Sequence, residues 1–92
     1  MRPQLTLGLF RAAEEQLEEA MTALGMVEGT DVRHQFEPHG TSWVRFSERG
    51  RVVFHTWPER KLISVDVWSE DGIDLNAQLA TLGWIPVDGA EQ

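Results

Sequence analysis

Two side chains in the second half of the chain could act as a general acid or base. They are His55, which follows a run of alternating residues, and Glu70, which comes just before the turn residues Asp71 and Gly72. A glutamate can donate a proton when burial raises its pKa. Beside a turn, Glu70 is expected to be a surface charge, and a lone histidine is more often structural than catalytic. The residue types alone therefore select neither a catalytic residue nor a reaction.

Three histidines raise the question of a metal site. His34 and His39 are separated by a strand-and-turn segment, with Glu37 between them, and His55 follows later. This is no recognised zinc-ligand spacing. The chain has no cysteine, which excludes thiolate ligands, disulfides and thiol catalysis. Neither a glycine-rich phosphate loop nor the spacing of a nucleophilic triad is present. We therefore expect no metal.

These side chains must be positioned by a mixture of strands and helices. Strands are predicted over 5–10, 32–36, 42–47, 51–57, 62–69 and 84–87, and helices over 11–24 and 75–82. Strands joined by hairpins imply a mainly antiparallel sheet, and two amphipathic helices should cover one of its faces. The expected fold is an α+β two-layer sandwich, built as a single domain over residues 1–92.

Each predicted helix has one apolar stripe and a glycine stop. In the first, the stripe is Ala13, Leu17, Ala20, Met21 and Leu24, with Gly25 as the stop. Its acidic run, Glu14, Glu15, Glu18 and Glu19, is interpreted as a solvated face. The second helix has Leu75, Leu79 and Leu82, with Asp71 or Asp74 as its cap and Gly83 as its stop. The tail from Asp88 to Gln92 is expected to fray.

The uncovered face of the sheet is predicted to be aromatic. In the fifth strand Ile63, Val65 and Val67 point one way, and the residues between them point the other. One register places His34, Phe36, His55, Trp57 and Trp68 together on this second face. An apolar surface of that size on a small domain usually binds a ligand, a second subunit or both.

The segment from His34 to Gly72 resembles the bacterial S-adenosylmethionine decarboxylases. His34-Gln35-Phe36-Glu37-Pro38-His39-Gly40-Thr41-Ser42 is similar to their first characteristic block, and His55-Thr56-Trp57-Pro58-Glu59 matches their hallmark segment. Val65-Asp66-Val67-Trp68 matches the strand that follows. The resemblance covers a little under half of the chain, and the flanking elements agree in order only. It implies a two-layer α+β sandwich whose sheets pair in a dimer.

The resemblance also implies a ligand site. In the family, the residues that match Phe36 and His55 sandwich the adenine ring of the substrate. The residue matching Glu59 holds the ribose hydroxyls, and the one matching Trp57 helps to line the pocket. The residue matching Ser42 assists the processing of an internal serine, as does the one matching His55. Binding of S-adenosylmethionine or a related adenosyl ligand is therefore expected.

The residues for the family's covalent chemistry are missing. That chemistry needs a serine whose hydroxyl attacks the preceding carbonyl, so that the chain is cleaved and a pyruvoyl group becomes the electron sink. Here the serine position is Gly50, flanked by Arg49 and Arg51, and the family's catalytic cysteine falls at Glu70. Glycine has no hydroxyl, so no pyruvoyl cofactor is expected. Glu48-Arg49-Gly50 instead reads as a hairpin turn, with positive φ at the glycine.

Composition limits the function classes. A formal net charge of −7 in 92 residues disfavours nucleic acids and anionic membranes but suits a cationic ligand. No apolar run approaches the ~18 residues of a membrane span, and a cytoplasmic location is the simplest expectation.

Three functions remain open. The first is a non-processing homologue of S-adenosylmethionine decarboxylase that binds an adenosyl ligand, as a homodimer or as a heterodimer with a paralogue. The second is a regulatory subunit that pairs with an active paralogue in polyamine biosynthesis. The third is a pyruvoyl-independent enzyme acting on an adenosyl substrate, with His55 or Glu70 as acid or base.

Overall fold

The computed structural model describes residues 4–70 and 72–87, which form six strands, two α-helices and two short 3-10 helices. In chain order the elements are β1 (Gln4–Arg11), η1 (Glu14–Gln16), α1 (Leu17–Ala23), β2 (Thr30–Gln35), β3 (Thr41–Ser47), β4 (Gly50–Trp57), η2 (Pro58–Arg60), β5 (Leu62–Ser69), α2 (Leu75–Ala80) and β6 (Ile85–Pro86). The described strands therefore agree in number and order with the prediction.

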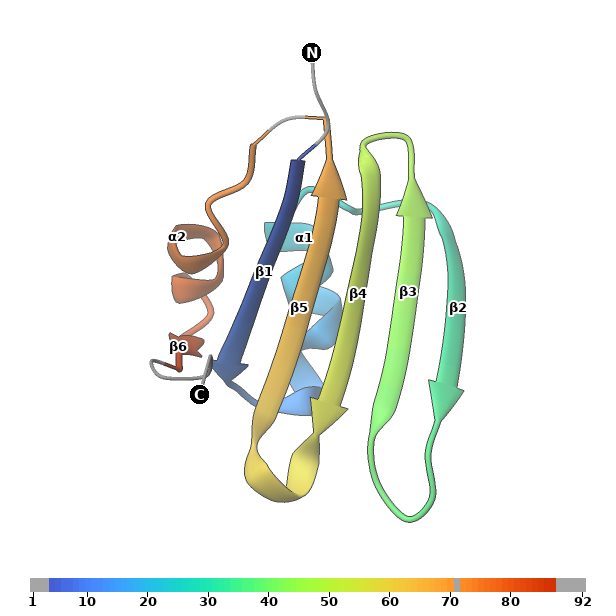
Figure 1. Ribbon diagram of the computed structural model, residues 1–92, viewed down its shortest axis with the longest axis vertical. Coiled ribbons are helices and arrows are strands. Elements are labelled where there is room, and N and C mark those ends of the chain that lie inside the picture. The colour runs from blue at the N-terminus through green and yellow to red at the C-terminus, as the bar shows by residue number, and fades with distance from the viewer. Residues whose placement is uncertain (1–3, 71, 88–92) are drawn as a thin grey trace.

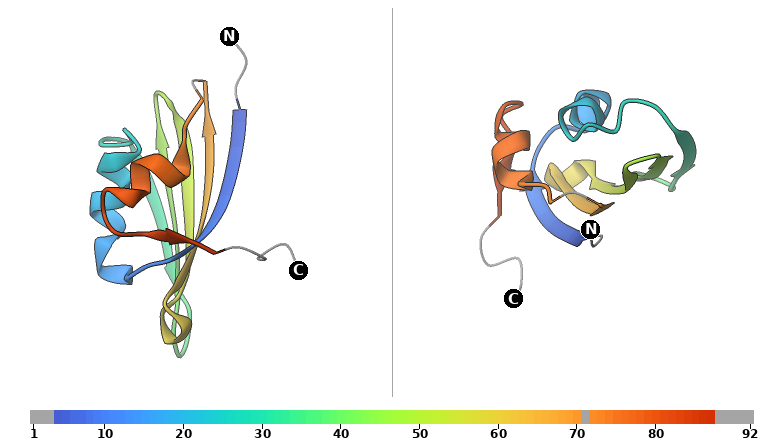
Figure 2. Two further views of the ribbon diagram at one scale, coloured as in Figure 1. Left: turned by 90° about the vertical axis from the view of Figure 1, so that its left-hand side faces the viewer. Right: turned by 90° about the horizontal axis from the view of Figure 1, so that it is seen from above.

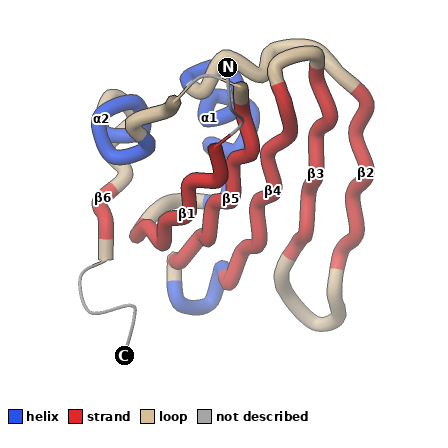
Figure 3. Tube along the Cα trace, turned by 45° about the horizontal axis from the view of Figure 1, so that its top comes forward, coloured by secondary structure: helices blue, strands red, loops and turns tan. Residues whose placement is uncertain are grey.

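The strands form one antiparallel sheet in the order β2-β3-β4-β5-β1-β6. Figure 1 shows that the sheet presents one uncovered face, and Figure 2 shows α1 and α2 together on its other side. The predicted α+β two-layer sandwich, mainly antiparallel with two helices on one face, is confirmed. β4 and β5 are joined by the short η2 turn at the lower edge of the sheet (Figure 3).

Strict alternation along the strands builds the core. In β4 the side chains of Val52 and Phe54 are buried against the helices, and in β5 those of Ile63, Val65 and Val67 are buried in the same layer. Their neighbours in sequence point to the uncovered face, because successive side chains of a strand alternate between faces. The predicted inward and outward sets of the fifth strand are therefore correct.

The first helix is shorter than predicted. Ala13 is exposed, with an extended backbone (φ −94°, ψ 133°), and the chain turns through η1 before α1 begins at Leu17. The reason is that the sheet extends past β1, since the Ala12 N–H donates to the Lys61 carbonyl at 3.0 Å. Residues tied to a strand cannot be helical. Leu17, Ala20, Met21 and Leu24 do form the buried stripe, and Gly25 ends the helix with a φ of +80°.

The second helix begins at the predicted aspartate. Asp74 is the N-cap of α2, and its Oδ1 accepts the Ala77 N–H at 3.1 Å. The α-helix ends at Ala80, two residues earlier than predicted, and Gly83 follows with a φ of +83°. Asp71, the other predicted cap, and the tail from Asp88 lie outside the described residues.

A buried arginine ties the two layers together. Arg45 points inward from β3 with only 7% of its surface exposed. It donates to both carboxylate oxygens of Asp31, at 2.7 and 2.9 Å, and to the carbonyls of Met26 and Val27. It also contacts Glu18 at 3.4 Å. The hydrogen bond from Arg45 is the main reason that the pKa of Asp31 lies below its ordinary value.

Candidate functional site

A cavity of about 410 Å³ opens where β3 begins and β4 ends. Its walls are residues 39–42 and 55–57, together with Phe36. This volume lies within the range of small-molecule pockets, although its opening to solvent is wide. Four of the predicted ligand-binding residues, Phe36, Ser42, His55 and Trp57, line this one cavity, and we refer to it as the HTW pocket.

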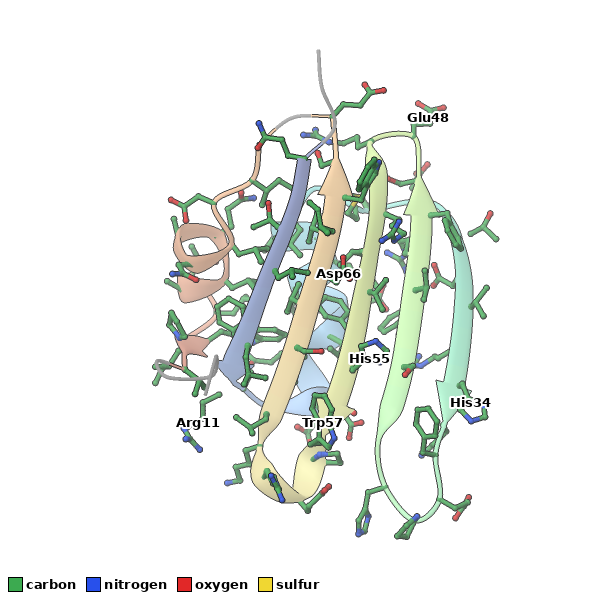
Figure 4. All side chains as sticks on the ribbon, in the orientation of Figure 1. Arg11, His34, Glu48, His55, Trp57 and Asp66 are labelled. Atoms are coloured by element: carbon green, nitrogen blue, oxygen red, sulfur yellow. The ribbon has the colours of Figure 1, made fainter. Side chains whose placement is uncertain are left out.

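The centre of the HTW pocket is a serine–histidine pair. Ser42 on β3 and His55 on β4 are directly opposite in the antiparallel register, so both side chains leave the same face of the sheet. The Ser42 Oγ lies 2.7 Å from the His55 Nδ1, which is hydrogen-bond distance. Figure 4 shows His55 and Trp57 projecting from the uncovered face. The contact with Ser42 therefore restrains the His55 imidazole beside the aromatic residues of the pocket.

Two exposed aromatic rings flank this pair. Phe36 and Trp57 remain 48% and 42% exposed, which is high for side chains of their size. Phe36 is held by a tight turn, in which its N–H donates to the Gly40 carbonyl at 2.8 Å, and by an edge-on contact with His34 at 4.4 Å between ring centroids. A flat apolar group could stack here on an already ordered ring.

The carboxylate expected to complete the pocket lies outside its wall. Glu59 is in η2, the turn that follows Trp57, and it is exposed. It does not line the HTW pocket. The turn is closed by Lys61 in a left-handed conformation (φ +55°). Glu59 thus follows the pocket residue Trp57 by two positions in the sequence. Its role in ligand binding stays a prediction.

The two positions that the resemblance assigns to the family's covalent chemistry, Gly50 and Glu70, lie at the other end of the strands. Gly50 begins β4, and His55 lies five positions further along the strand, which corresponds to ~17 Å of extended chain. Glu70 lies beside Gly50, because Gly50 pairs with Ser69 and the Glu70 N–H donates to the Arg49 carbonyl at 3.3 Å. The sequence-predicted catalytic pair, His55 and Glu70, is therefore not brought together within one chain.

The structure leaves no room for a side chain at position 50. A Cβ added to Gly50 would lie 1.8 Å from the Trp68 carbonyl oxygen, and the φ of +146° is one that other residues rarely adopt. The predicted hairpin turn with positive φ is confirmed. Gly50 lacks a hydroxyl, and its backbone packs against β5 in the space that a serine side chain would need. Residue 50 therefore does not fit a pyruvoyl-forming position.

A larger hollow does not coincide with the predicted site. A space of about 660 Å³ lies between the loop after α1 and the β3–β4 hairpin, where it is lined by Glu28, Glu48, Arg49 and neighbouring residues. It lacks the histidine and paired aromatic rings of the HTW pocket, so we place the candidate site in the smaller cavity. Within residues 4–70 and 72–87, no three potential metal ligands cluster.

Among the residues of the site that sequence reasoning missed are Glu14 and the two threonines that it binds. Glu14, assigned to a solvated acidic face, reaches under the pocket, and its Oε2 accepts hydrogen bonds from the hydroxyls of Thr41 and Thr56. Glu18 in the same run contacts Arg45. The pattern of charges along a helix could not reveal this, because Glu14 lies in η1 before the α-helix starts.

Comparisons with known proteins point to one family. Residues 6–82 match the model of a family described as S-adenosylmethionine decarboxylase. The S-adenosylmethionine decarboxylase proenzyme of Persephonella marina is 36% identical over 58 residues, covering 63% of this chain and 44% of that protein. The proenzyme of Thermoanaerobacter sp. (strain X514) is 35% identical over 66 residues, covering 67% of this chain and 52% of that protein. This chain thus spans about half the length of these curated relatives.

The fold is also similar to that of a solved structure. The crystal structure of the adenosylmethionine decarboxylase from Aquifex aeolicus VF5 matches with a TM-score of 0.59 and 21% sequence identity, covering 86% of this chain and 73% of that chain. At this identity the likeness concerns the fold alone.

Among the described residues, no helix is long and apolar enough to cross a membrane.

Proposed function

Because the chain belongs to the S-adenosylmethionine decarboxylase family, we propose that it binds S-adenosylmethionine or a related adenosyl ligand without forming a pyruvoyl group. The observation that supports this is the HTW pocket, which assembles Phe36, Ser42, His55 and Trp57 in one cavity. A formal net charge of −7 suits a sulfonium cation. The ligand's adenine ring would stack on Phe36 and the His55 imidazole.

The proposal separates binding from chemistry. Decarboxylation in this family needs an electron sink, and Gly50 has neither the hydroxyl to generate one nor the space for a side chain. Stacking and hydrogen bonds to the adenosyl group need no such sink. The protein should therefore hold the ligand without turning it over, as a binding or regulatory member of the family.

Removing the stacking ring or the carboxylate should weaken binding. In a calorimetric titration with S-adenosylmethionine, Phe36→Ala is expected to raise the Kd by roughly 10-fold, because base–aromatic stacking contributes ~1–3 kcal/mol. Glu59→Ala should also weaken binding if its carboxylate reaches the ribose hydroxyls. Val27→Ala is the control, since Val27 is 59% exposed and lies in the loop after α1, outside both the HTW pocket and the uncovered face of the sheet. Equally poor binding by the wild type and both variants would end the ligand proposal.

The uncovered face of the sheet supports a second element of the proposal, a dimer. Leu7 on β1 is 66% exposed, and the row across the sheet continues through Asp66 and Val53 to Val44 and Val32. Large exposed residues surround this row: Leu5, Phe46, Trp57 and Trp68. Five strands of about seven residues give a footprint of roughly 20 by 23 Å, sufficient for a small specific interface. A second sheet of the same kind would cover it.

Pairing of sheets would also explain why the HTW pocket and Gly50 lie apart. Within one chain they occupy opposite ends of β4. If two sheets pair face to face with opposed strand directions, the pocket end of one chain meets the Gly50 end of the other. The partner is then either a second copy or a paralogue that carries an intact serine. In the second case this chain would supply a pocket to an active partner.

A charge on the uncovered face should dissociate the dimer. Leu7→Glu is expected to yield a monomer in sedimentation equilibrium, because it buries an unpaired carboxylate between the sheets. Val27→Glu should leave the dimer unchanged, since Val27 is similarly exposed, at 59%, but lies in the loop after α1. A wild type that is monomeric at high concentration, and that copurifies with no serine-containing homologue from its own host, would contradict the pairing.

A further inference from the structure

The β3–β4 ladder stops at the pocket, and a side chain continues it. The last paired residues are Ser42 and His55. One step further, the Thr41 N–H donates to the hydroxyl oxygen of Thr56 at 2.9 Å, where a regular ladder would use a backbone carbonyl. The two strands therefore separate at the residues that form the walls of the HTW pocket. The orientation of one hydroxyl decides where that separation occurs.

Glu14 sets the orientation of this hydroxyl. The Thr56 Oγ1 donates its single proton to the Glu14 Oε2 at 2.9 Å, which leaves its lone pairs free to accept from Thr41. The Thr41 Oγ1 donates to the same Glu14 oxygen at 3.2 Å. Thr41 and Thr56 are 7% and 5% exposed, so water has little access to replace the carboxylate. One oxygen from the β1–α1 connection thus fixes both strands.

These bonds lie directly behind the binding face. Thr41 precedes Ser42, and Thr56 lies between His55 and Trp57. Because side chains alternate along a strand, a bond on the helix side of Thr41 and Thr56 restrains the backbone that carries the pocket residues on the other side. We propose that Glu14 is a positioning residue that sets the separation of the two walls of the HTW pocket. The effect on ligand affinity rests on the proposed function.

The test compares three variants by calorimetric titration with S-adenosylmethionine. Glu14→Met removes the acceptor at similar size and should weaken binding about 10-fold. Glu14→Gln keeps a carbonyl oxygen at the same place and should stay within about 3-fold of the wild type. Glu15→Met is the matched control, because Glu15 is its exposed neighbour, and binding should be unchanged. Thermal unfolding is measured for each variant so that affinities refer to folded protein.

A double-mutant cycle distinguishes positioning from a general loss of stability. Thr56→Val should weaken binding in the wild type and have a smaller effect in Glu14→Met, because both changes remove the hydrogen bond between Thr56 and Glu14. Equal affinities for the wild type and Glu14→Met would overturn the proposal. Independent, additive losses from the two changes would also overturn it, because they would mean that Glu14 does not act through Thr56.

A second readout does not depend on the ligand. The nitrogen NMR shift of His55 Nδ1 reports its hydrogen bond to Ser42 in the free protein. This shift should move in Glu14→Met and remain at its wild-type value in Glu14→Gln and Glu15→Met. If the wild type binds no S-adenosylmethionine, the ligand proposal fails, and this shift still decides the role of Glu14. An unchanged shift in folded Glu14→Met would overturn the positioning role.

Discussion

Restoring a serine at the vacant position should not restore processing. Gly50→Ser is expected to give one uncleaved chain by intact mass and to lower the free energy of unfolding by at least ~3 kcal/mol. The new Cβ would lie 1.8 Å from the Trp68 carbonyl oxygen, in a backbone with a φ of +146°. β4 and β5 would have to separate at the hairpin to accommodate it.

Gly83→Ser is the control for this experiment. Gly83 also has a positive φ, +83°, but a Cβ there meets nothing within 4 Å. That variant should show only the cost of the left-handed backbone, ~1–2 kcal/mol. Similar losses in the two variants would mean that the contact with Trp68 does not matter. Cleavage of Gly50→Ser into two fragments, the second of which begins with a pyruvoyl group, would show that the position still supports the family's chemistry.

Replacing the buried arginine should have an effect of similar size on stability. Arg45→Met is expected to destabilise the fold by about 2–4 kcal/mol in urea unfolding, because it removes a buried side chain that donates several hydrogen bonds and leaves the Met26 carbonyl without that donor. Asp31 would lose two hydrogen bonds, and the Met26 and Val27 carbonyls would each lose one. Arg33→Met is the control, since Arg33 is exposed and stacks on the Trp43 ring at 4.2 Å. Equal effects would contradict the assigned role of Arg45.

The same network predicts a pH dependence. The pKa of Asp31 is lowered from 3.8 in the folded protein, mainly by its hydrogen bond from Arg45. Stability from this pair is therefore fully present above the unfolded pKa and is lost as the pH falls through the lower, folded value. In acid unfolding, the wild type should lose this contribution below about pH 4, and Arg45→Met should show a flatter curve over that window.

Most of the fold follows from local patterns. β5 was predicted to the residue, because its alternation is unbroken and Pro58 and the turn after Ser69 limit it on either side. Asp74 was one of two predicted caps. The start of the first helix was missed, because the Ala12 bond to Lys61 is a contact between distant segments and leaves no mark on periodicity.

The site could be predicted only in part. A register argument placed Phe36, His55 and Trp57 on one face of the sheet, and motif resemblance added Ser42, which pairs with His55. Motif resemblance located Phe36 and the vacant Gly50. Neither argument could find Glu14, whose role depends on a connection packing beneath two strands.

The HTW pocket and the exposed apolar residues lie on the same face of the sheet. Arg51 and Asp66 lie on that face with 3.7 Å between the Arg51 Nη2 and the Asp66 Oδ1, among the exposed apolar residues. A face of this composition is unusual for a domain that remains alone in water. The pocket opens on the same face, so ligand binding and pairing would be coupled by position.

The most direct test of ligand binding without pyruvoyl formation is a calorimetric titration of the wild-type protein with S-adenosylmethionine. The sample must have the intact mass of the uncleaved chain. We expect saturable binding with one site per chain and no decarboxylated product. An uncleaved chain that shows no binding at millimolar ligand, under conditions where the protein is folded, would contradict it.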